Sequence, residues 1–225
     1  MKKNTQNIQN KKDINTTEIL WLKSEADKGN SYAQNTVGKL IFNGQGIKKD
    51  YGVALHYYRL SANQGNPHGQ FNVGFMYHFG ISVHKSYQEA VRWYKRSVEQ
   101  GNSNAQLNLG YMYHNGLGVE IDFEEAMRLY SLAADQGNSC GLCNKGYMFE
   151  HGLGGVEKNY VKAFKLYEKA ARVEDRVGLN NLGHMFHHGY GVKKNLEQAM
   201  LLYSMSAKKG YYKARVNMKN LAKIL

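Results

Sequence analysis

The feature that most constrains the fold is an internal repeat of about 36 residues. A glycine closes most copies, and these glycines are Gly29, Gly65, Gly101, Gly137 and Gly210. In the fourth full copy Glu174 takes this place one residue late, because Gly155 is inserted in the preceding loop. A unit this short cannot bury a core alone, so consecutive units must stack into one array.

Each copy predicts two helices. In residues 104–138, Ala105, Leu109, Met112 and Tyr113 share one face of the first helix. Gly110 lies inside this helix, where glycine costs roughly 1 kcal/mol relative to alanine. Because the same glycine recurs in every copy, we expect close packing there, with the backbone of the neighbouring helix in place of a side chain.

The second helix of each copy begins at a good N-cap residue. The aligned caps are Asp50, Ser86, Asp122, Asn159 and Asn195. Ala126, Tyr130 and Ala133 then form the inner stripe of the helix. Ser82 replaces the second glycine of the Gly-x-Gly loop in one copy. Serine is poorly suited to a left-handed backbone, so we expect that loop to differ in shape.

These patterns predict an all-α fold, an α-solenoid of antiparallel helix pairs. Residues 1–15 are polar and basic and are expected to be a disordered tail. Ile19, Leu20, Leu22 and Ala26 predict a helical half repeat. The expected organisation is a half repeat at 16–30, repeats at about 31–66, 67–102, 103–138, 139–175 and 176–210, and a capping helix at 211–225, whose inner stripe continues at Ala214, Met218 and Leu221.

The net charge of +12 is concentrated at the ends, with +4 in residues 1–12 and +6 in residues 208–225. The basic ends either keep the array soluble or contact an acidic surface weakly. No nucleic-acid-binding motif accompanies them. No apolar run approaches the roughly 20 residues that span a bilayer, and the N-terminus has no apolar core of a signal peptide. We therefore expect a cytoplasmic protein without a transmembrane segment.

The repeat pattern resembles the Sel-one-like repeat family, a branch of the tetratricopeptide group, over about residues 16–225. The residues that carry the resemblance are Ala105, Leu109, Gly110, Met112, Tyr113, Gly116, Gly118, Val119, Asp122, Ala126, Tyr130, Ala133, Ala134, Gly137 and Asn138. The resemblance implies a right-handed superhelix that acts as an adaptor, or scaffold, for a protein or peptide partner. Family members are known in signalling, in endoplasmic-reticulum quality control and in bacterial contact with host cells.

One bacterial subgroup of that family has a cysteine pair in each repeat and is often labelled β-lactamase. This chain has only Cys140 and Cys143, which we interpret as helix-packing residues. Residues 82–85 and 206–209 match S-x-x-K, but the S-D-N and K-T-G elements of that hydrolase are missing. His184 and His188 have a zinc-compatible spacing without a glutamate in H-E-x-x-H. A hydrolase or a metal-binding protein is thus the alternative, and we predict no catalytic residue, metal or cofactor.

The first-helix positions outside the inner stripe are the candidate binding residues. Asparagine recurs two residues before the internal glycine, an aromatic ring or histidine follows that glycine, and histidine recurs one turn later. The predicted partner-binding residues are Asn72, Phe75, Asn108, Tyr111, His114, Asn144, Tyr147, Asn181, His184 and His187. Asparagine amides can hold a peptide backbone. The alternative is that they join neighbouring repeats and that the tyrosines belong partly to the core.

Overall fold

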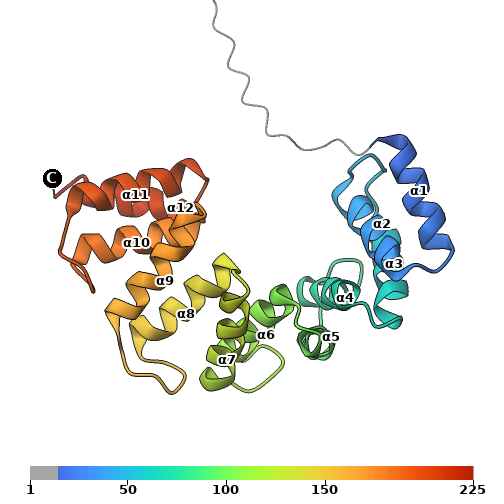
Figure 1. Cartoon of the computed structure of the whole chain (residues 1–225), viewed down its shortest axis with the longest axis horizontal. Helices are drawn as coiled ribbons and strands as arrows, with labels where there is room; N and C mark the ends of the chain where they lie inside the picture. The colour runs from blue at the N-terminus through green and yellow to red at the C-terminus, as the bar shows by residue number, and fades with distance from the viewer. Residues whose placement is uncertain (1–14, 225) are drawn as a thin grey trace, which may run out of the picture. The chain divides into compact units, whose positions relative to one another are not determined.

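The computed structural model describes residues 15–224, and every regular element in that range is an α-helix. Their order along the chain is shown in Figure 1. The helices are α1 Thr16–Asp27, α2 Ser31–Asn43, α3 Tyr51–Asn63, α4 Pro67–Phe79, α5 Tyr87–Glu99, α6 Ser103–Asn115, α7 Phe123–Asp135, α8 Ser139–His151, α9 Tyr160–Arg172, α10 Arg176–His188, α11 Leu196–Lys208 and α12 Tyr212–Leu221. The predicted all-α class is confirmed. None of these helices is long and apolar enough to span a bilayer.

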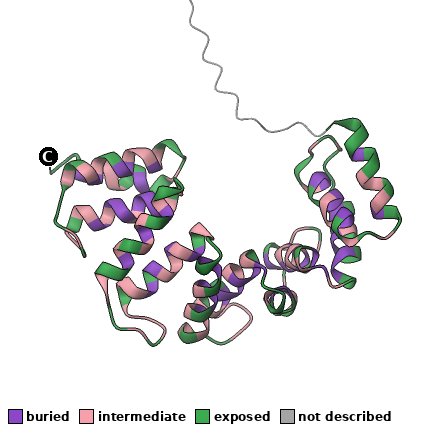
Figure 2. Ribbon diagram, in the orientation of Figure 1, coloured by how far each residue is buried: buried purple, intermediate pink, exposed green. Residues whose placement is uncertain are grey.

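The chain divides into two compact units, the first ending at Lys85 and the second beginning at Ser86. The first unit holds α1–α4 and the second holds α5–α12. Within each unit, a first helix packs on the second helix that follows it, as in the pairs α2/α3, α6/α7, α8/α9 and α10/α11. Buried residues run as stripes along the helices (Figure 2). The array is therefore a solenoid of repeating helical pairs.

Polar caps define where the helices begin. The predicted caps of the second helices are confirmed, because each side chain accepts a hydrogen bond from the backbone N–H three residues later. The first helices from α2 to α10 are capped in the same way. Each cap is the last residue of the preceding predicted unit. These caps are Asn30, Asn66, Asn102, Asn138 and Asp175. Such a cap contributes about 1 kcal/mol.

The internal glycines of the first helices face tyrosine rings. A Cβ added at Gly110 would lie 2.9 Å from Cε1 of Tyr130, and Gly146 meets Tyr167 in the same way. The expected close packing is present, but the expectation that backbone fills the space is wrong. Backbone does so at a glycine nearer the start of the helix, since a Cβ at Gly141 would lie 2.9 Å from the nitrogen of Ala134.

The loop at Ser82 keeps the shape of its counterparts, so the expected difference is wrong. Ser82 has φ 58°, close to φ 68° at Gly46 and φ 72° at Gly118, its aligned positions. The serine Oγ lies 3.5 Å from the point where Gly52 would carry a Cβ, so a second glycine provides room for the hydroxyl. Packing of the loop on the preceding second helix thus overrides the residue's own preference. Glu174 is likewise left-handed, with φ 56°.

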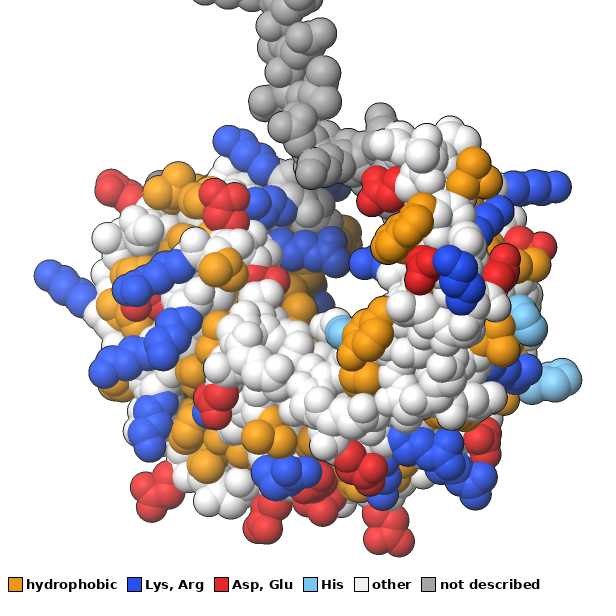
Figure 3. Space-filling view, turned by 45° about the vertical axis from the view of Figure 1, so that its right-hand side comes forward, with side chains coloured by type: hydrophobic (Ala, Val, Ile, Leu, Met, Phe, Trp, Pro, Cys, Tyr) orange, Lys and Arg blue, Asp and Glu red, His pale blue; other side chains and the backbone are white. Residues whose placement is uncertain are grey.

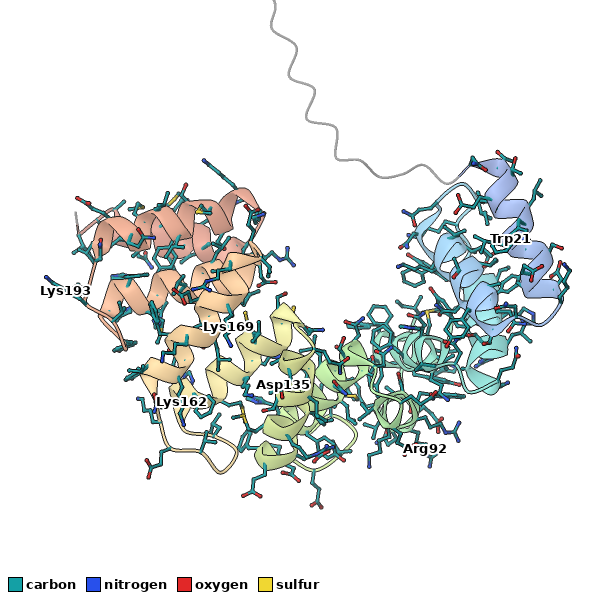
Figure 4. The ribbon with its side chains drawn as sticks, viewed as in Figure 1. Trp21, Arg92, Asp135, Lys162, Lys169 and Lys193 are labelled. Carbon is teal, nitrogen blue, oxygen red and sulfur yellow. The ribbon has the colours of Figure 1, made fainter. Side chains whose placement is uncertain are left out.

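The two end helices differ from the repeats. Asn15 caps α1 by accepting from the Glu18 backbone N–H, so it belongs to the helix and not to the predicted tail. The rest of that tail, residues 1–14, lies outside the described residues. Leu20 is 62% exposed, which corrects its assignment to the inner stripe, and Trp21 beside it is 61% exposed (Figure 4). In α12, Ala214 and Leu221 are buried as expected, and Met218 is partly buried.

Candidate partner-binding groove

Charge is partitioned between the two kinds of helix. The first helices α2, α4, α6, α8 and α10 contain 4 charged residues in all, whereas the second helices α3, α5, α7, α9 and α11 contain 17. Arg92 on α5 and Lys162 and Lys169 on α9 belong to the second set (Figure 4). The first helices of each unit are therefore nearly uncharged, and asparagine, tyrosine and histidine recur on them. Figure 3 shows lysine, arginine and acidic side chains interspersed over the face in view.

Two adjoining hollows lie on the first helices of the second unit. One, of about 410 Å³, is lined by Tyr111, His114, Asn115, Tyr130, Asn144, Tyr147 and Lys213. The other, of about 440 Å³, is lined by Cys143, Asn144, Tyr147, Glu150, His151, Tyr167, Val177, Asn180, Asn181, His184, Tyr211 and Lys213. Asn144, Tyr147 and Lys213 line both hollows, which therefore adjoin and are together called the α6–α10 groove.

Six of the ten predicted binding residues line this groove. They are Tyr111, His114, Asn144, Tyr147, Asn181 and His184. Tyr111 and Tyr147 are 46% and 40% exposed, so their rings are available on the groove wall. Binding by these residues stays a prediction, but the structure brings them together around one space.

The other four predicted residues make structural contacts. In the first unit, Asn72 Nδ2 donates to Asn35 Oδ1 at 2.7 Å, and the Phe75 ring packs 4.6 Å from that of Phe79. In the second unit, Asn108 Nδ2 donates to the Tyr94 hydroxyl at 3.3 Å. His187 Nδ1 lies 3.4 Å from the hydroxyl of the buried Tyr203.

The recurring asparagine therefore has two environments. Asn72 joins neighbouring first helices, and Asn217 repeats this contact by donating to Asn180 Oδ1 at 2.9 Å. Asn144 instead lines both hollows of the groove. Repeat position alone does not separate these cases, because the partners of Asn72 and Asn217 lie on another helix.

A glutamate lies at the floor of the groove. The Tyr167 hydroxyl donates to Glu150 Oε2 at 2.7 Å, and His184 Nδ1 lies 3.6 Å from Glu150 Oε1. Burial raises the pKa of Tyr167, and the Glu150 charge adds to this, so the hydroxyl stays protonated and donates. Burial, followed by His188, lowers the pKa of His184, with Glu150 acting in the opposite direction. Glu150 is the negative end of the groove.

His114 is incompletely satisfied. Its Nδ1 is the single buried side-chain polar atom without a hydrogen-bond partner in the part of the chain that the structure describes. The His114 ring lies 5.7 Å from the Tyr147 ring and 5.2 Å from the Phe123 ring. Burial lowers the pKa of His114, and His151 lowers it further, so the imidazole is neutral at pH 7.

Sequence reasoning missed Lys213 as a groove residue. It was grouped with the basic C-terminal segment, yet it lines both hollows from α12. A signal was available, since Lys213 aligns with Val177 when α12 is read as another first helix, and Val177 also lines the groove. Glu150 occupies the position that His78, His114 and His187 take in other repeats, so the recurring-histidine pattern did not select it.

The residues considered for catalysis or metal binding have other environments. Ser206 is buried and its Oγ donates to the Arg176 carbonyl at 2.6 Å. Cys140 and Cys143 are free thiols, and burial raises the pKa of both. Cys143 is buried, as the packing interpretation requires, whereas Cys140 is exposed, so the interpretation is wrong for Cys140. Within residues 15–224, no group of three or more histidine, cysteine, aspartate or glutamate side chains is placed to hold a metal ion.

Repeated helical pairs with a groove lined mainly by asparagine, tyrosine and histidine define a helical-repeat interaction module. The family model of the Sel1 repeat matches residues 31–66, 67–102, 103–138, 141–174 and 177–211. The chain therefore belongs to the Sel1 repeat family, whose members are generally non-enzymatic protein-interaction scaffolds. A comparison with curated proteins gave no significant match.

Solved structures share the fold. A protective antigen present in uropathogenic Escherichia coli strains, which displays an SLR fold, is 35% identical with a TM-score of 0.76. The alignment covers 90% of this chain and 43% of that protein, so this chain spans less than half of its length. A Sel1 repeat protein from Oxalobacter formigenes is 29% identical with a TM-score of 0.82, covering 90% of this chain and 80% of that one.

Proposed function

We propose that this chain is a scaffold that binds an extended peptide segment of a protein partner in the α6–α10 groove. The observation that carries the proposal is the convergence of six predicted residues, from three first helices, around two adjoining hollows. A groove this poor in charge imposes little desolvation cost on a peptide backbone compared with a surface of lysines and glutamates.

The groove offers two kinds of contact. The rings of Tyr111 and Tyr147 supply rigid contact area, because a tyrosine side chain loses little conformational entropy when it is immobilised. Asn144 and Asn181 each present amide donors and an acceptor, which match the N–H and C=O groups of an extended chain. Together these contacts favour a peptide over a small molecule.

A display selection with random 12-residue peptides against the purified chain tests this function. We expect enriched peptides whose Kd rises about tenfold in Tyr147→Ala, which is equivalent to about 1.4 kcal/mol. Arg92→Ala is the matched control, because Arg92 is an exposed residue of a second helix that pairs with Glu89 of its own helix. Peptides that bind both variants equally, or no enrichment, would refute the groove proposal.

A further inference from the structure

We propose that the end of the groove between α6 and α8 binds a carboxylate of the peptide partner. The inference rests on the proposed function and specifies the partner's chemistry. The observation behind it is a hollow lined by one ammonium group, by no acid and by Tyr130, whose hydroxyl has no hydrogen-bond partner among the described residues.

The buried tyrosines of the second helices show what is missing there. Tyr94 accepts from Asn108, Tyr167 donates to Glu150, and the Tyr203 hydroxyl lies next to His187. At the corresponding place in residues 103–138, Tyr130 faces His114 with ring centroids 6.4 Å apart. No hydrogen bond joins this pair or engages the Tyr130 hydroxyl within the described chain.

Every polar group around this hollow is able to donate. The Tyr130 hydroxyl stays protonated because burial raises its pKa, with Tyr111 adding to the effect. Lys213 contributes an ammonium group and Asn144 an amide. The complementary ligand group is acceptor-only and negatively charged, as a carboxylate is.

The charges in the groove favour a carboxylate over a phosphate and set its position. A phosphate dianion is usually held by several cationic side chains, often arginines, whereas Lys213 is the one cation lining this hollow. In the adjoining hollow, Glu150 disfavours a second acid. The bound segment is thus oriented, with its acidic residue between α6 and α8 and a neutral or basic residue near Glu150.

The test uses the peptide enriched by display, synthesised with blocked termini. We expect an aspartate or glutamate in it, and replacing that residue by its amide should raise Kd about tenfold. Lys213→Met should raise the Kd of the acidic peptide by a similar factor and change that of the amide peptide less than twofold. Lys219→Met is the control, since Lys219 is an exposed lysine of the same helix.

Two further peptides, one with a free C-terminus and one with phosphoserine, distinguish the outcomes. If a peptide with a free C-terminus binds and loses affinity on amidation, the carboxylate that the groove binds is the C-terminus of the partner peptide. A phosphoserine peptide that binds better than the acidic one would overturn the carboxylate inference. Equal Kd for the acid and amide peptides, with binding still sensitive to Tyr147→Ala, would refute this inference and leave the proposed function standing. If no peptide binds, both are refuted.

Discussion

The ring of Tyr130 occupies the space where a side chain on Gly110 would begin, with Cε1 2.9 Å from the Cβ position. The same relationship joins Gly38 with Tyr58, Gly146 with Tyr167 and Gly183 with Tyr203. Glycine and tyrosine at this spacing are therefore one structural unit. The glycine of the first helix has no side chain, and the tyrosine ring of the second helix is buried in the space that this leaves.

The first prediction concerns this pair. Gly110→Ala should lower the free energy of unfolding by about 1 kcal/mol, because an overpacking cost of about 1–3 kcal/mol exceeds the gain of about 1 kcal/mol in helix propensity. Urea denaturation measures the change. In a Tyr130→Leu background the ring is absent, so the same alanine should stabilise. Stabilisation by Gly110→Ala in the parent chain would contradict the explanation.

The second prediction concerns the left-handed serine. Ser82→Gly should stabilise the chain by about 1 kcal/mol, since a non-glycine residue pays roughly 1–2 kcal/mol in this conformation. The reverse change, Gly118→Ser, should destabilise by more, because its Cβ would lie 2.6 Å from the Tyr87 carbonyl carbon. Thermal unfolding compares the two variants, and opposite shifts in Tm are expected.

The third prediction tests the floor of the groove. Glu150→Ala should cost about 1–3 kcal/mol, because it leaves the hydroxyl of the buried Tyr167 without its acceptor. Adding Tyr167→Phe to that variant should recover part of the loss, since no hydroxyl is then left unpaired. A double-mutant cycle by urea denaturation measures the coupling. Strictly additive effects would show that the hydrogen bond contributes nothing.

The fourth prediction is a pH dependence. Burial lowers the pKa of His78, His114, His184 and His187 below the ordinary value of 6.5. Unfolding returns each histidine pKa to its ordinary value. At a pH below that value, the unfolded state therefore binds more protons than the folded state. The histidines should not reduce the free energy of unfolding above about pH 7.5. That free energy should fall as the pH drops through 6.5 towards the lowered pKa values. Urea midpoints from pH 8 to pH 5 check the direction, and His114→Phe should flatten the curve.

Much of the fold was predictable because each repeat contains the residues that begin, orient and end its helices. Capping residues such as Asp122, the alternation of Ala126 and Tyr130, and the closing glycines act within one or two helical turns. Leu20 was assigned wrongly because its position lies on the solvent-facing side of the second helices, and Leu201, which aligns with it, is exposed as well. The shape of the Ser82 loop was wrongly expected because packing of the loop on the preceding second helix decides its conformation.

The candidate site was predictable only in part. The repeat register identified Tyr111, Asn144 and Tyr147 as residues outside the inner stripe, and the structure places them on one groove. The repeat register could not distinguish Asn144 from Asn72. The difference is that Asn72 donates a hydrogen bond to Asn35, which lies on another helix.

The sequence by itself determined the helical pairs, their period and their caps, because these depend on residues that are neighbours along the chain. The tertiary structure alone decided which polar groups are satisfied. It brings Lys213 beside Tyr111 and Asn144 from a distant part of the chain and leaves His114 Nδ1 without a partner. Hydrogen bonding and charge act over a few ångströms in space, so a groove assembled from three repeats and a terminal helix appears only when the units are stacked.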